Sequence, residues 1–421
     1  MSNKKILIIG SGGREHALIR KFKESNKIDT IFVTPGNPGM KKDAVVLGKL
    51  SYPEIIDFYK KNEIYFIFVG PEQPLSEGFV DLCQLENVRI IGPNKKAAQI
   101  ESSKIFAKNL MKKYNVPTAD YFIFDNFEKA KSFLKSCKYP QVLKADGLAA
   151  GKGVSIVGNY SEAISELNKI MIDEKFGEAG SKIVIEEFME GWEASIFAFC
   201  DGEHFVSTIF SQDHKRVFDG DKGENTGGMG AYAPVLKANK YKKFIDENIF
   251  TPTLQGLKAE GAAFSGILFA GLMFTKAGPK VVEFNCRFGD PETEVILPLL
   301  KTDLFKISEA IINQTIDKIE PEWKDKFAVT VVAASKGYPG KYEKSKKIFI
   351  DLEEDAENFI NFAGVKEVAG EIYTNGGRVL MVTAVDDGIK KTVKKVYKNI
   401  ENVKFEGMFF RKDIAKQALT D

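Results

Sequence analysis

A glycine-rich loop with a lysine near each end is the first feature of this sequence that suggests chemistry. The segment KADGLAAGKGV, residues 144–154, consists mainly of Gly and Ala between its lysines. Backbone amides of such a loop can approach phosphate oxygens, and lysine neutralises their charge. A Walker A loop needs four residues between its first Gly and the Gly-Lys pair, then Ser or Thr. Only three residues separate Gly147 from Gly151, and Gly153 follows Lys152. The spacing therefore disfavours a P-loop NTPase and leaves two interpretations, a polyphosphate-binding loop and a flexible turn between strands.

A carboxylate and an amide two residues apart mark a second region, KVVEFNCRFGDPETE, residues 280–294. In a strand, Glu283 and Asn285 project from the same face, because side chains alternate along a strand. Carboxylate and amide oxygens suit magnesium that is bound together with substrate phosphates. Arg287 and Asp290 follow in a turn that would face the same crevice. The alternative is an exposed edge strand, which the apolar neighbours of these residues disfavour.

A third polar cluster lies within residues 210–234, where Asp213, His214 and Lys215 precede a second Gly-rich loop, Asn225–Gly230. A single histidine is more often structural than catalytic, and the sequence holds only three. It contains neither the HExxH spacing of a metalloprotease nor the GxSxG elbow of a serine hydrolase. No covalent nucleophile is evident in these residues.

The elements that must position these residues begin with a sheet. The first hundred residues alternate strand and helix signals, which predicts a doubly wound parallel sheet. Ligands of such sheets bind outside the carboxyl ends of the strands, and Gly/Pro loops occupy three of these ends. The predicted strands are residues 5–10, 30–34, 64–70 and 88–92, and the loops read GSGGREH, TPGNPG and GPEQPL.

The first of these loops carries a partial dinucleotide fingerprint. It has Gly10 and Gly12, but Glu15 stands where the third Gly is required. Gly12 and Gly13 nevertheless allow backbone amides to approach an anion at the N-terminus of the following helix, and Arg14 adds positive charge. The alternative is a tight strand-to-helix turn with a solvated Arg14. The residues leave both interpretations open.

The chain is predicted to be an α/β protein with four parts. A helical pattern over residues 94–115 is broken by VPTADYF, and a compact α/β lid containing the Gly-rich loop follows. Apolar strands at 327–335, 348–350 and 378–385 predict a separate C-terminal α+β domain, which ends in a helix over 390–400. The predicted parts are an N-terminal substrate-binding α/β domain (1–102), a central body (103–122 and 191–325), a lid (123–190) and a C-terminal domain (326–421).

The composition favours a small-molecule substrate. Lys plus Arg (60) nearly balance Asp plus Glu (58) among 421 residues, so no overall field would hold nucleic acid or an anionic membrane. The longest apolar run, residues 266–274, is too short to span a bilayer, and the N-terminus lacks a signal-peptide pattern. Four scattered cysteines suit neither a zinc site nor a disulfide framework. We therefore expect a cytoplasmic protein that binds neither nucleic acid nor membrane.

Together these segments resemble the ATP-grasp superfamily, in which two lysines, a Gly-rich lid loop, an IEEF strand and an EFN strand follow one another in this order. Within it, the sequence resembles the phosphoribosylamine-glycine ligase family. The resemblance covers essentially the whole chain, because seven motifs occur in order and two more lie near the end. They read GGREHAL, PGNPG, VGPEQPL, KADGLAAGKGV, SQDHKRV, NTGGMGAY and EFNCRFGDPE, followed by TNGGRVL and FRKDIA.

This resemblance implies a role for each group of residues. Two lysines contact ATP phosphates under the closing loop, a pair of glutamates lies at the adenine and hinge, and a further glutamate binds the ribose. The expected ATP-binding residues are Lys104, Lys144, Gly147, Gly151, Lys152, Gly153, Glu186, Glu187 and Glu193. The expected ligands of Mg²⁺ or Mn²⁺ are Glu283 and Asn285, and the expected catalytic residues are Arg287, Asp213, Lys215 and Asp290. The expected substrate-binding residues are Gly12, Gly13, Arg14, Pro35, Gly36, Asn37, Asn225, Thr226 and Gly227, with His16 left out as a residue that caps or packs.

The implied reaction is the second step of de novo purine biosynthesis. ATP phosphorylates glycine, and the amine of 5-phosphoribosylamine attacks the glycyl phosphate to give glycinamide ribonucleotide, ADP and phosphate. We expect a monomer that makes a transient contact with the amidophosphoribosyltransferase. Three alternatives stay open: another ATP-grasp carboxylate-amine ligase, a non-catalytic ATP sensor, and a dinucleotide-binding dehydrogenase. The presence of Glu283, Asn285, Lys144 and Arg287 argues against a sensor, and the dehydrogenase depends only on the partial fingerprint at Gly10.

Overall fold

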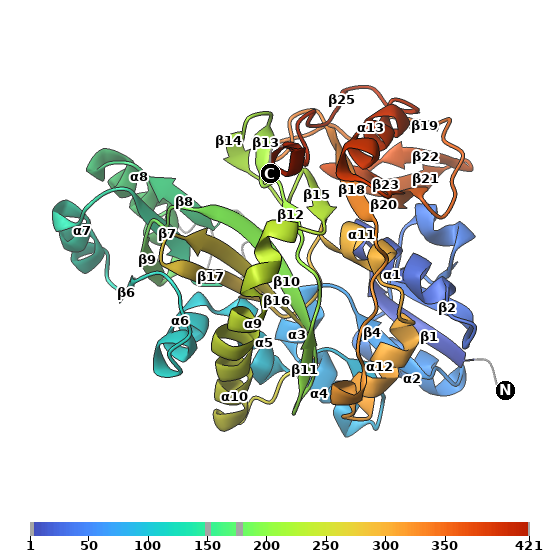
Figure 1. Ribbon diagram of the computed structural model, residues 1–421, viewed down its shortest axis with the longest axis horizontal. Coiled ribbons are helices and arrows are strands. Elements are labelled where there is room, and N and C mark those ends of the chain that lie inside the picture. The colour runs from blue at the N-terminus through green and yellow to red at the C-terminus, as the bar shows by residue number, and fades with distance from the viewer. Residues whose placement is uncertain (1–3, 148–152, 174–179, 420–421) are drawn as a thin grey trace.

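The computed structural model describes residues 4–147, 153–173 and 180–419 (Figure 1). Its N-terminal part is a five-stranded sheet of order β3-β2-β1-β4-β5 in which every pair is parallel, and this confirms the predicted doubly wound sheet. Ile6 and Ile8 of β1 pack into one hydrophobic core and Leu7 and Ile9 into another, because both faces of the sheet are covered. The elements are β1 (Lys4–Gly10), α1 (Gly13–Lys23), β2 (Ile28–Pro35), β3 (Val45–Val46), α2 (Tyr52–Lys61), β4 (Phe66–Val69), α3 (Glu72–Glu77), α4 (Phe79–Leu85) and β5 (Ile90–Ile91).

The helical pattern over residues 94–115 folds as two helices, α5 (Lys95–Ser102) and α6 (Lys104–Lys113), so the prediction of one continuous helix was wrong. Ser103 between them has extended backbone angles, φ −133° and ψ 112°. Its hydroxyl accepts a hydrogen bond from the amide of Phe106 at 3.1 Å. Ser103 thus caps a new helix, because its side chain satisfies an amide at the helix start that has no partner within the helix.

The lid is a four-stranded antiparallel sheet of order β6-β9-β7-β8 with two helices packed on it. It has its own hydrophobic core, in which Leu134 and Leu167 of the helices meet Leu143 and Ile185 of the strands. In Figure 1 the lid projects to the left of the remaining parts. Its elements are β6 (Tyr121–Phe124), α7 (Phe127–Ser136), β7 (Gln141–Ala145), β8 (Val154–Val157), α8 (Tyr160–Met171) and β9 (Ile183–Glu187).

The central body contains a second antiparallel sheet, of order β11-β10-β16-β17. The long strands β10 and β16 are almost completely buried, and β17, which carries the EFN motif, forms the edge of this sheet. Helices α5, α6 and α10 lie below the sheet in Figure 1. The elements are β10 (Trp192–Asp201), β11 (Phe205–Ser207), α9 (Lys242–Ile245), α10 (Thr251–Ala259), β16 (Ser265–Thr275), β17 (Gly278–Asn285), α11 (Thr293–Ile296) and α12 (Leu304–Ile312).

The C-terminal part is built on a sheet of order β12-β15-β18-β23-β20, with β25 also paired to β18. Two of these strands, β12 and β15, come from residues 212–233, so the sheet includes segments from both sides of the predicted boundary at 326. The helix α13 (Ile389–Ile400) buries Val396 and Ile400, as its spacing predicts. The strands are β12 (Gln212–Asp213), β13 (Arg216–Phe218), β14 (Lys222–Asn225), β15 (Gly230–Ala233), β18 (Phe327–Ser335), β19 (Phe349–Ile350), β20 (Asn358–Phe362), β21 (Val365–Val368), β22 (Glu371–Thr374), β23 (Arg378–Asp386), β24 (Val403–Lys404) and β25 (Met408–Phe409).

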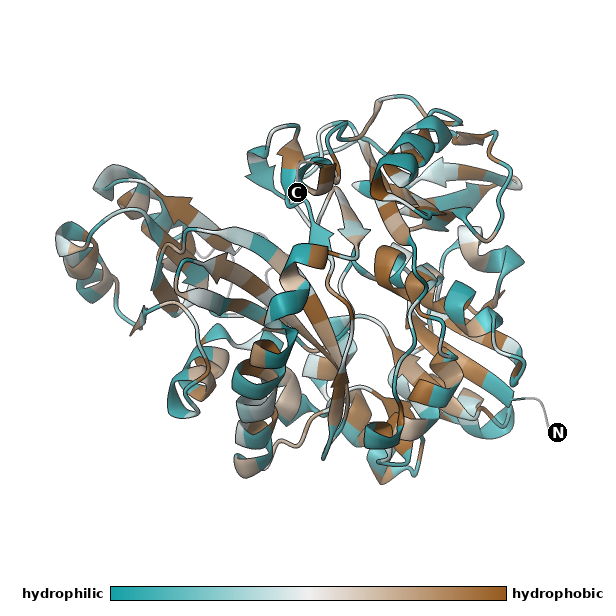
Figure 2. Ribbon diagram, in the orientation of Figure 1, coloured by the Kyte–Doolittle hydropathy of each residue, from teal (hydrophilic) through white to brown (hydrophobic). Residues whose placement is uncertain are grey.

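Apolar residues concentrate in the strands of the main sheets, and the outer helices carry polar residues on their exposed faces (Figure 2). Among the described residues, none of the helices combines the length and the apolar character that a bilayer crossing requires.

Candidate active site

The two predicted phosphate-binding lysines meet where the lid contacts β17. Lys104 begins α6 and donates a hydrogen bond to the carbonyl of Gly147, at the start of the Gly-rich loop, at 2.8 Å. Lys144 ends β7 and donates to the carbonyl of Val282 at 3.2 Å. Burial lowers the pKa of Lys104, and the carboxylate of Glu283 is the strongest opposing influence. Helix, lid and edge strand therefore place both lysines beside β17, which carries Glu283.

The Gly-rich loop is only partly covered by the structure. Gly153 accepts a hydrogen bond from the amide of Ala145 at 2.9 Å, which closes the loop at its base. Gly151 and Lys152 lie outside the described residues, as does most of the segment predicted to close over ATP.

Glu283 and Asn285 provide two oxygen donors with different surroundings. Within the described residues, the carboxylate of Glu283 has no hydrogen-bond or ion-pair partner, although its backbone pairs with Gly271 in the sheet. The amide nitrogen of Asn285 donates to Glu101 at 2.9 Å, which leaves its oxygen available. A carboxylate and an amide oxygen on one strand face fit a hard divalent cation. Glu101 orients the amide, as an outer partner commonly does for a metal ligand.

Arg287 is held in place by two carboxylates. Its guanidinium donates to Glu101 at 2.7 Å and to Glu72 at 3.2 Å. Burial disfavours the charge, but these carboxylates outweigh burial and raise the pKa of Arg287 above its ordinary value. Arg287 therefore remains positive beside the expected metal ligands.

Several acids lie close enough to Lys215 to act on its charge or to respond to it, and Glu292 is the buried one among them. The ammonium of Lys215 lies 2.7 Å from a carboxylate oxygen of Glu193. Burial raises the pKa of Asp213 to about 6, against the charge of Lys215. Burial and the neighbouring Asp213 raise the pKa of Glu292 to about 8. The structure thus brings the predicted catalytic residues Asp213 and Lys215 together with Glu193, which was expected at the ribose.

The second Gly-rich loop is tied to the C-terminal sheet by Arg378. This residue lies 2.9 Å from the carboxylate of Asp290 and donates to the carbonyl of Gly227 at 2.5 Å. The amide of Gly227 donates to the hydroxyl of Tyr338 at 3.0 Å, and the hydroxyl of Thr226 donates to the carbonyl of Lys215 at 2.9 Å. Asp290 therefore contributes to the site by fixing the position of this loop.

The N-terminal loop is organised around Glu15. Its carboxylate accepts a hydrogen bond from the amide of Gly12 at 2.6 Å, next to the start of α1. A Cβ atom on Gly10 would lie 2.4 Å from the Glu15 side chain, and one on Gly70 would lie 2.2 Å from it. These glycines therefore make room for the carboxylate that replaces the third glycine of the dinucleotide fingerprint. Arg14, which is 8% exposed, bonds to Glu15 at 2.6 Å and to the carbonyl of Phe288 at 3.1 Å.

Asn37 and His16 both connect the N-terminal sheet to the C-terminal part. The amide nitrogen of Asn37 donates to the carbonyls of Ser11 at 2.8 Å and Phe362 at 3.0 Å. His16 accepts from the amide of Phe362 at 2.9 Å and lies 3.1 Å from Asp43. His16 is fully buried and stacks on the ring of Phe362. The side chain of Asn37 likewise joins the two parts, and β2 ends at Pro35, two residues before it.

Four charged residues of the site were missed by sequence reasoning. Lys108 lies one helical turn after Lys104 in α6, so helical spacing was a usable signal for it. Glu101 lies in α5, on the other side of the break at Ser103, so helical spacing gave no signal for it. Glu292 belongs to the same motif as Asp290, and Arg378 lies in the TNGGRVL motif, but no spacing rule relates them to their partners.

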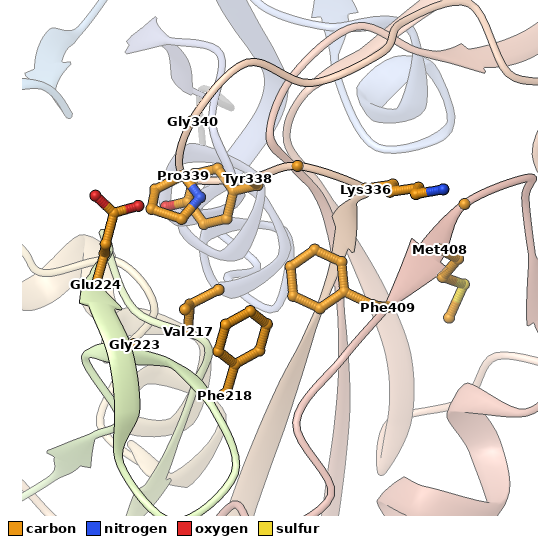
Figure 3. Close-up of a pocket in the computed structure, with 12 residues that line it drawn as sticks. Val217, Phe218, Gly223, Glu224, Lys336, Tyr338, Pro339, Gly340, Met408 and Phe409 are labelled. Atoms are coloured by element: carbon orange, nitrogen blue, oxygen red, sulfur yellow. The ribbon is translucent and has the colours of Figure 1, made fainter.

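A cavity of about 580 Å³ lies next to the second Gly-rich loop, between the β13–β14 hairpin and the C-terminal part. Phe218, Phe409 and Tyr338 line it together (Figure 3). Lys104 and Lys144, the two lysines predicted to bind phosphate, do not line it, but Tyr338 links its wall to Gly227.

A lid sheet facing a body sheet, with two lysines and a carboxylate-amide pair between them, defines an ATP-grasp enzyme. Family models match nearly the whole chain: the phosphoribosylglycinamide synthetase N domain (residues 4–101), its ATP-grasp (A) domain (102–293) and its C domain (328–417). The chain therefore belongs to the phosphoribosylglycinamide synthetase family.

Individual relatives agree with this assignment. The chain is 46% identical to a phosphoribosylamine-glycine ligase of Halalkalibacterium halodurans, over 99% of this chain and 97% of that protein. It is 46% identical to one of Caldanaerobacter subterraneus, over 98% of this chain and 99% of that protein. The crystal structure of a phosphoribosylamine-glycine ligase from Thermotoga maritima superposes with a TM-score of 0.87 at 36% identity, covering 98% of this chain and all of that one.

Proposed function

We propose that this protein joins glycine to 5-phosphoribosylamine with conversion of ATP to ADP and phosphate. The observation that carries the proposal is the position of Glu283, a carboxylate without a protein partner among the described residues. Its charge acts on Lys104 and also on Asp213 and Lys215. A phosphoryl group and an acyl group could therefore meet beside it.

We place ATP between the lid and the body. Lys104 and Lys144 neutralise its phosphates, and the loop 147–153 covers them. Glu186 and Glu187 belong to the strand that leads into the hinge, where Glu187 lies 3.1 Å from Lys280. Adenine is placed at this hinge. Ribose is placed near Glu193. Magnesium or manganese, held by Glu283 and Asn285, would supply further charge neutralisation of the phosphates.

The reaction needs no nucleophile from the protein. A glycine carboxylate oxygen attacks the γ-phosphorus of ATP, and ADP leaves. The amine nitrogen of phosphoribosylamine then attacks the acyl carbon of glycyl phosphate, phosphate leaves, and the nitrogen loses a proton. Arg287 is placed to neutralise the developing negative charge, because preorganised cations act strongly at a site that excludes water. Asp213 is placed to accept the proton, since a pKa of about 6 suits a general base near neutral pH.

The phosphoribosyl substrate is placed at the carboxyl ends of the parallel strands. Backbone amides of Gly12, Gly13 and the Pro35–Asn37 loop are the donors we assign to it, with Asn225–Gly227 on the opposite side. The side chain of Arg14 donates hydrogen bonds to Glu15 and to the carbonyl of Phe288, so we assign it the role of holding this loop in position. A monomer in the cytoplasm, in transient contact with the amidophosphoribosyltransferase, remains a prediction.

The test measures ADP release with glycine, phosphoribosylamine and ATP together, and then with each acceptor omitted. We expect ADP release only with both acceptors present, and one glycinamide ribonucleotide formed per ADP. ADP release that persists with a different acid or a different amine, at the same rate, would indicate another ATP-grasp ligase. ATP binding without any turnover would indicate a sensor.

A further inference from the structure

Glu186 is a buried carboxylate between two lysines. Its side chain is 2% exposed, with one oxygen 2.9 Å from Lys144 and the other 2.9 Å from Lys108. Lys108 also donates to the hydroxyl of Thr118 at 2.8 Å, and this hydroxyl donates in turn to the carbonyl of Val281 at 2.7 Å. Lys108 is thus fixed from two sides, although its role in phosphate binding is not evident from the sequence.

Two elements bring these three charges together. Lys144 on β7 and Glu186 on β9 are diagonal neighbours, because Val142 pairs with Glu186 in the register of the two strands. Lys108 comes from α6, one turn after Lys104. The cap at Ser103 starts this helix and thereby directs Lys104 to the Gly-rich loop and Lys108 to Glu186.

The charge balance of this triad determines what Lys144 offers to a phosphate. Two ammonium groups and one carboxylate leave a net charge of about +1. All three groups are largely buried, and charge interactions are stronger in the protein interior than in water. Without the charge of Lys108, Glu186 would cancel Lys144 completely.

We propose that Lys108 is a positioning residue for ATP, which holds the far oxygen of Glu186 so that Lys144 keeps net positive charge toward the phosphates. This inference rests on the proposed function only in placing ATP phosphates at Lys144. Lys108 itself does not touch the nucleotide.

The triad makes ATP binding sensitive to alkaline pH. Burial lowers the pKa of Lys108 to about 8, although Glu186 opposes the shift. The charged and titratable groups that face it are Glu186 and Glu187 on β9, Lys144 on β7 and the ring of Tyr121 on β6, whose centroid lies 5.6 Å from the ammonium. The charge is present below this pKa and is lost as the pH rises through it, so ATP affinity should fall above about pH 8.

The experiment measures the dissociation constant of ATP with magnesium by titration calorimetry, without glycine or phosphoribosylamine, between about pH 7 and pH 9.5. For Lys108→Met we expect binding about tenfold weaker at neutral pH, because one charge-assisted contact of Glu186 is lost. The alkaline decline of the native protein should disappear in this variant. Lys112→Met is the matched control, since Lys112 is an exposed lysine of the same helix near the same ring, and it should bind ATP normally.

Kinetics separate positioning from a general structural role. The Michaelis constant for ATP should rise in Lys108→Met while kcat at saturating ATP stays within about threefold, and Lys108→Arg should restore affinity without the alkaline decline. An unchanged dissociation constant in Lys108→Met would overturn the inference, as would a native protein whose ATP affinity is constant up to pH 9.5. The second measurement requires no variant to fold. The dissociation constant of ATP is measured without glycine or phosphoribosylamine. A negative result for Lys108 would therefore leave the proposed ligase activity untouched.

Discussion

Glu101 should control both the stability of the site and its affinity for metal. Its first carboxylate oxygen accepts from Arg287 at 2.7 Å and from Asn285 at 2.9 Å, and its second accepts from the amide of Cys286 at 2.7 Å. Glu101→Gln removes the charge and leaves only one acceptor oxygen. If that oxygen stays with Arg287 and Asn285, the new amide group faces the Cys286 amide, which then lacks an acceptor.

The expected loss of stability is about 3 kcal/mol in the free energy of unfolding. Removing one partner of a buried ion pair costs about 3–5 kcal/mol, and the lower end applies because Glu72 still neutralises Arg287. The expected loss of metal affinity is about 10- to 100-fold, as for other outer partners that orient a metal ligand. Urea denaturation measures the first effect, and the magnesium dependence of the initial rate measures the second.

Glu72→Gln is the matched control for this prediction. Glu72 makes a longer contact with Arg287, at 3.2 Å, and its side chain is 30% exposed compared with 6% for Glu101. We expect a loss of about 1 kcal/mol and an unchanged magnesium requirement, because Glu72 is more exposed than Glu101 and does not contact Asn285. A Glu101→Gln variant that is less stable but has the native half-saturating magnesium concentration would refute the idea that Glu101 orients Asn285.

Three further predictions concern the reaction. Glu283→Ala should abolish ligation without unfolding the protein, since it removes one of two hard metal ligands; near-normal turnover at saturating magnesium would contradict this role. The rate should fall as the pH drops through about 6, where Asp213 takes up a proton and stops serving as a base, and Asp213→Asn should lack this limb. Burial raises the pKa of Asp213 in the folded state, so protonation of Asp213 should stabilise the folded protein as the pH falls through this range. The free energy of unfolding, measured with urea at the same pH values, therefore distinguishes lost activity from lost stability. Tyr338→Phe should raise the Michaelis constant for phosphoribosylamine about fivefold, because the amide of Gly227 loses its hydrogen-bond acceptor. An equal rise in the Michaelis constant for ATP would contradict the assignment of this loop to phosphoribosylamine.

Local features of the sequence determined the N-terminal sheet and part of the site. Short apolar runs that alternate with helical spacing predict buried parallel strands, because both faces of such a sheet must be covered. Glu283 and Asn285 were predicted on one face because a strand has a side-chain period of two, which no distant residue alters. The Gly-rich loop was recognised from its composition and its two lysines, and its binding of phosphate stays a prediction. The family resemblance added roles for these residues that their spacing alone left open.

The partners of the charged residues were decided only by the tertiary structure. Glu101 meets Asn285 across 184 positions of sequence, and Arg378 meets Gly227 across 151. A buried charge must find a partner, but nothing in its own segment specifies which one. For the same reason, β15 joined the C-terminal sheet through a pairing of Gly230 with Val331 that no local pattern indicates. The break at Ser103 also escaped the helical pattern, because apolar spacing continues across it while the hydroxyl starts a second helix. Sequence thus determined which residue types can bind phosphate and metal, and the packing of distant segments decided which charges orient them.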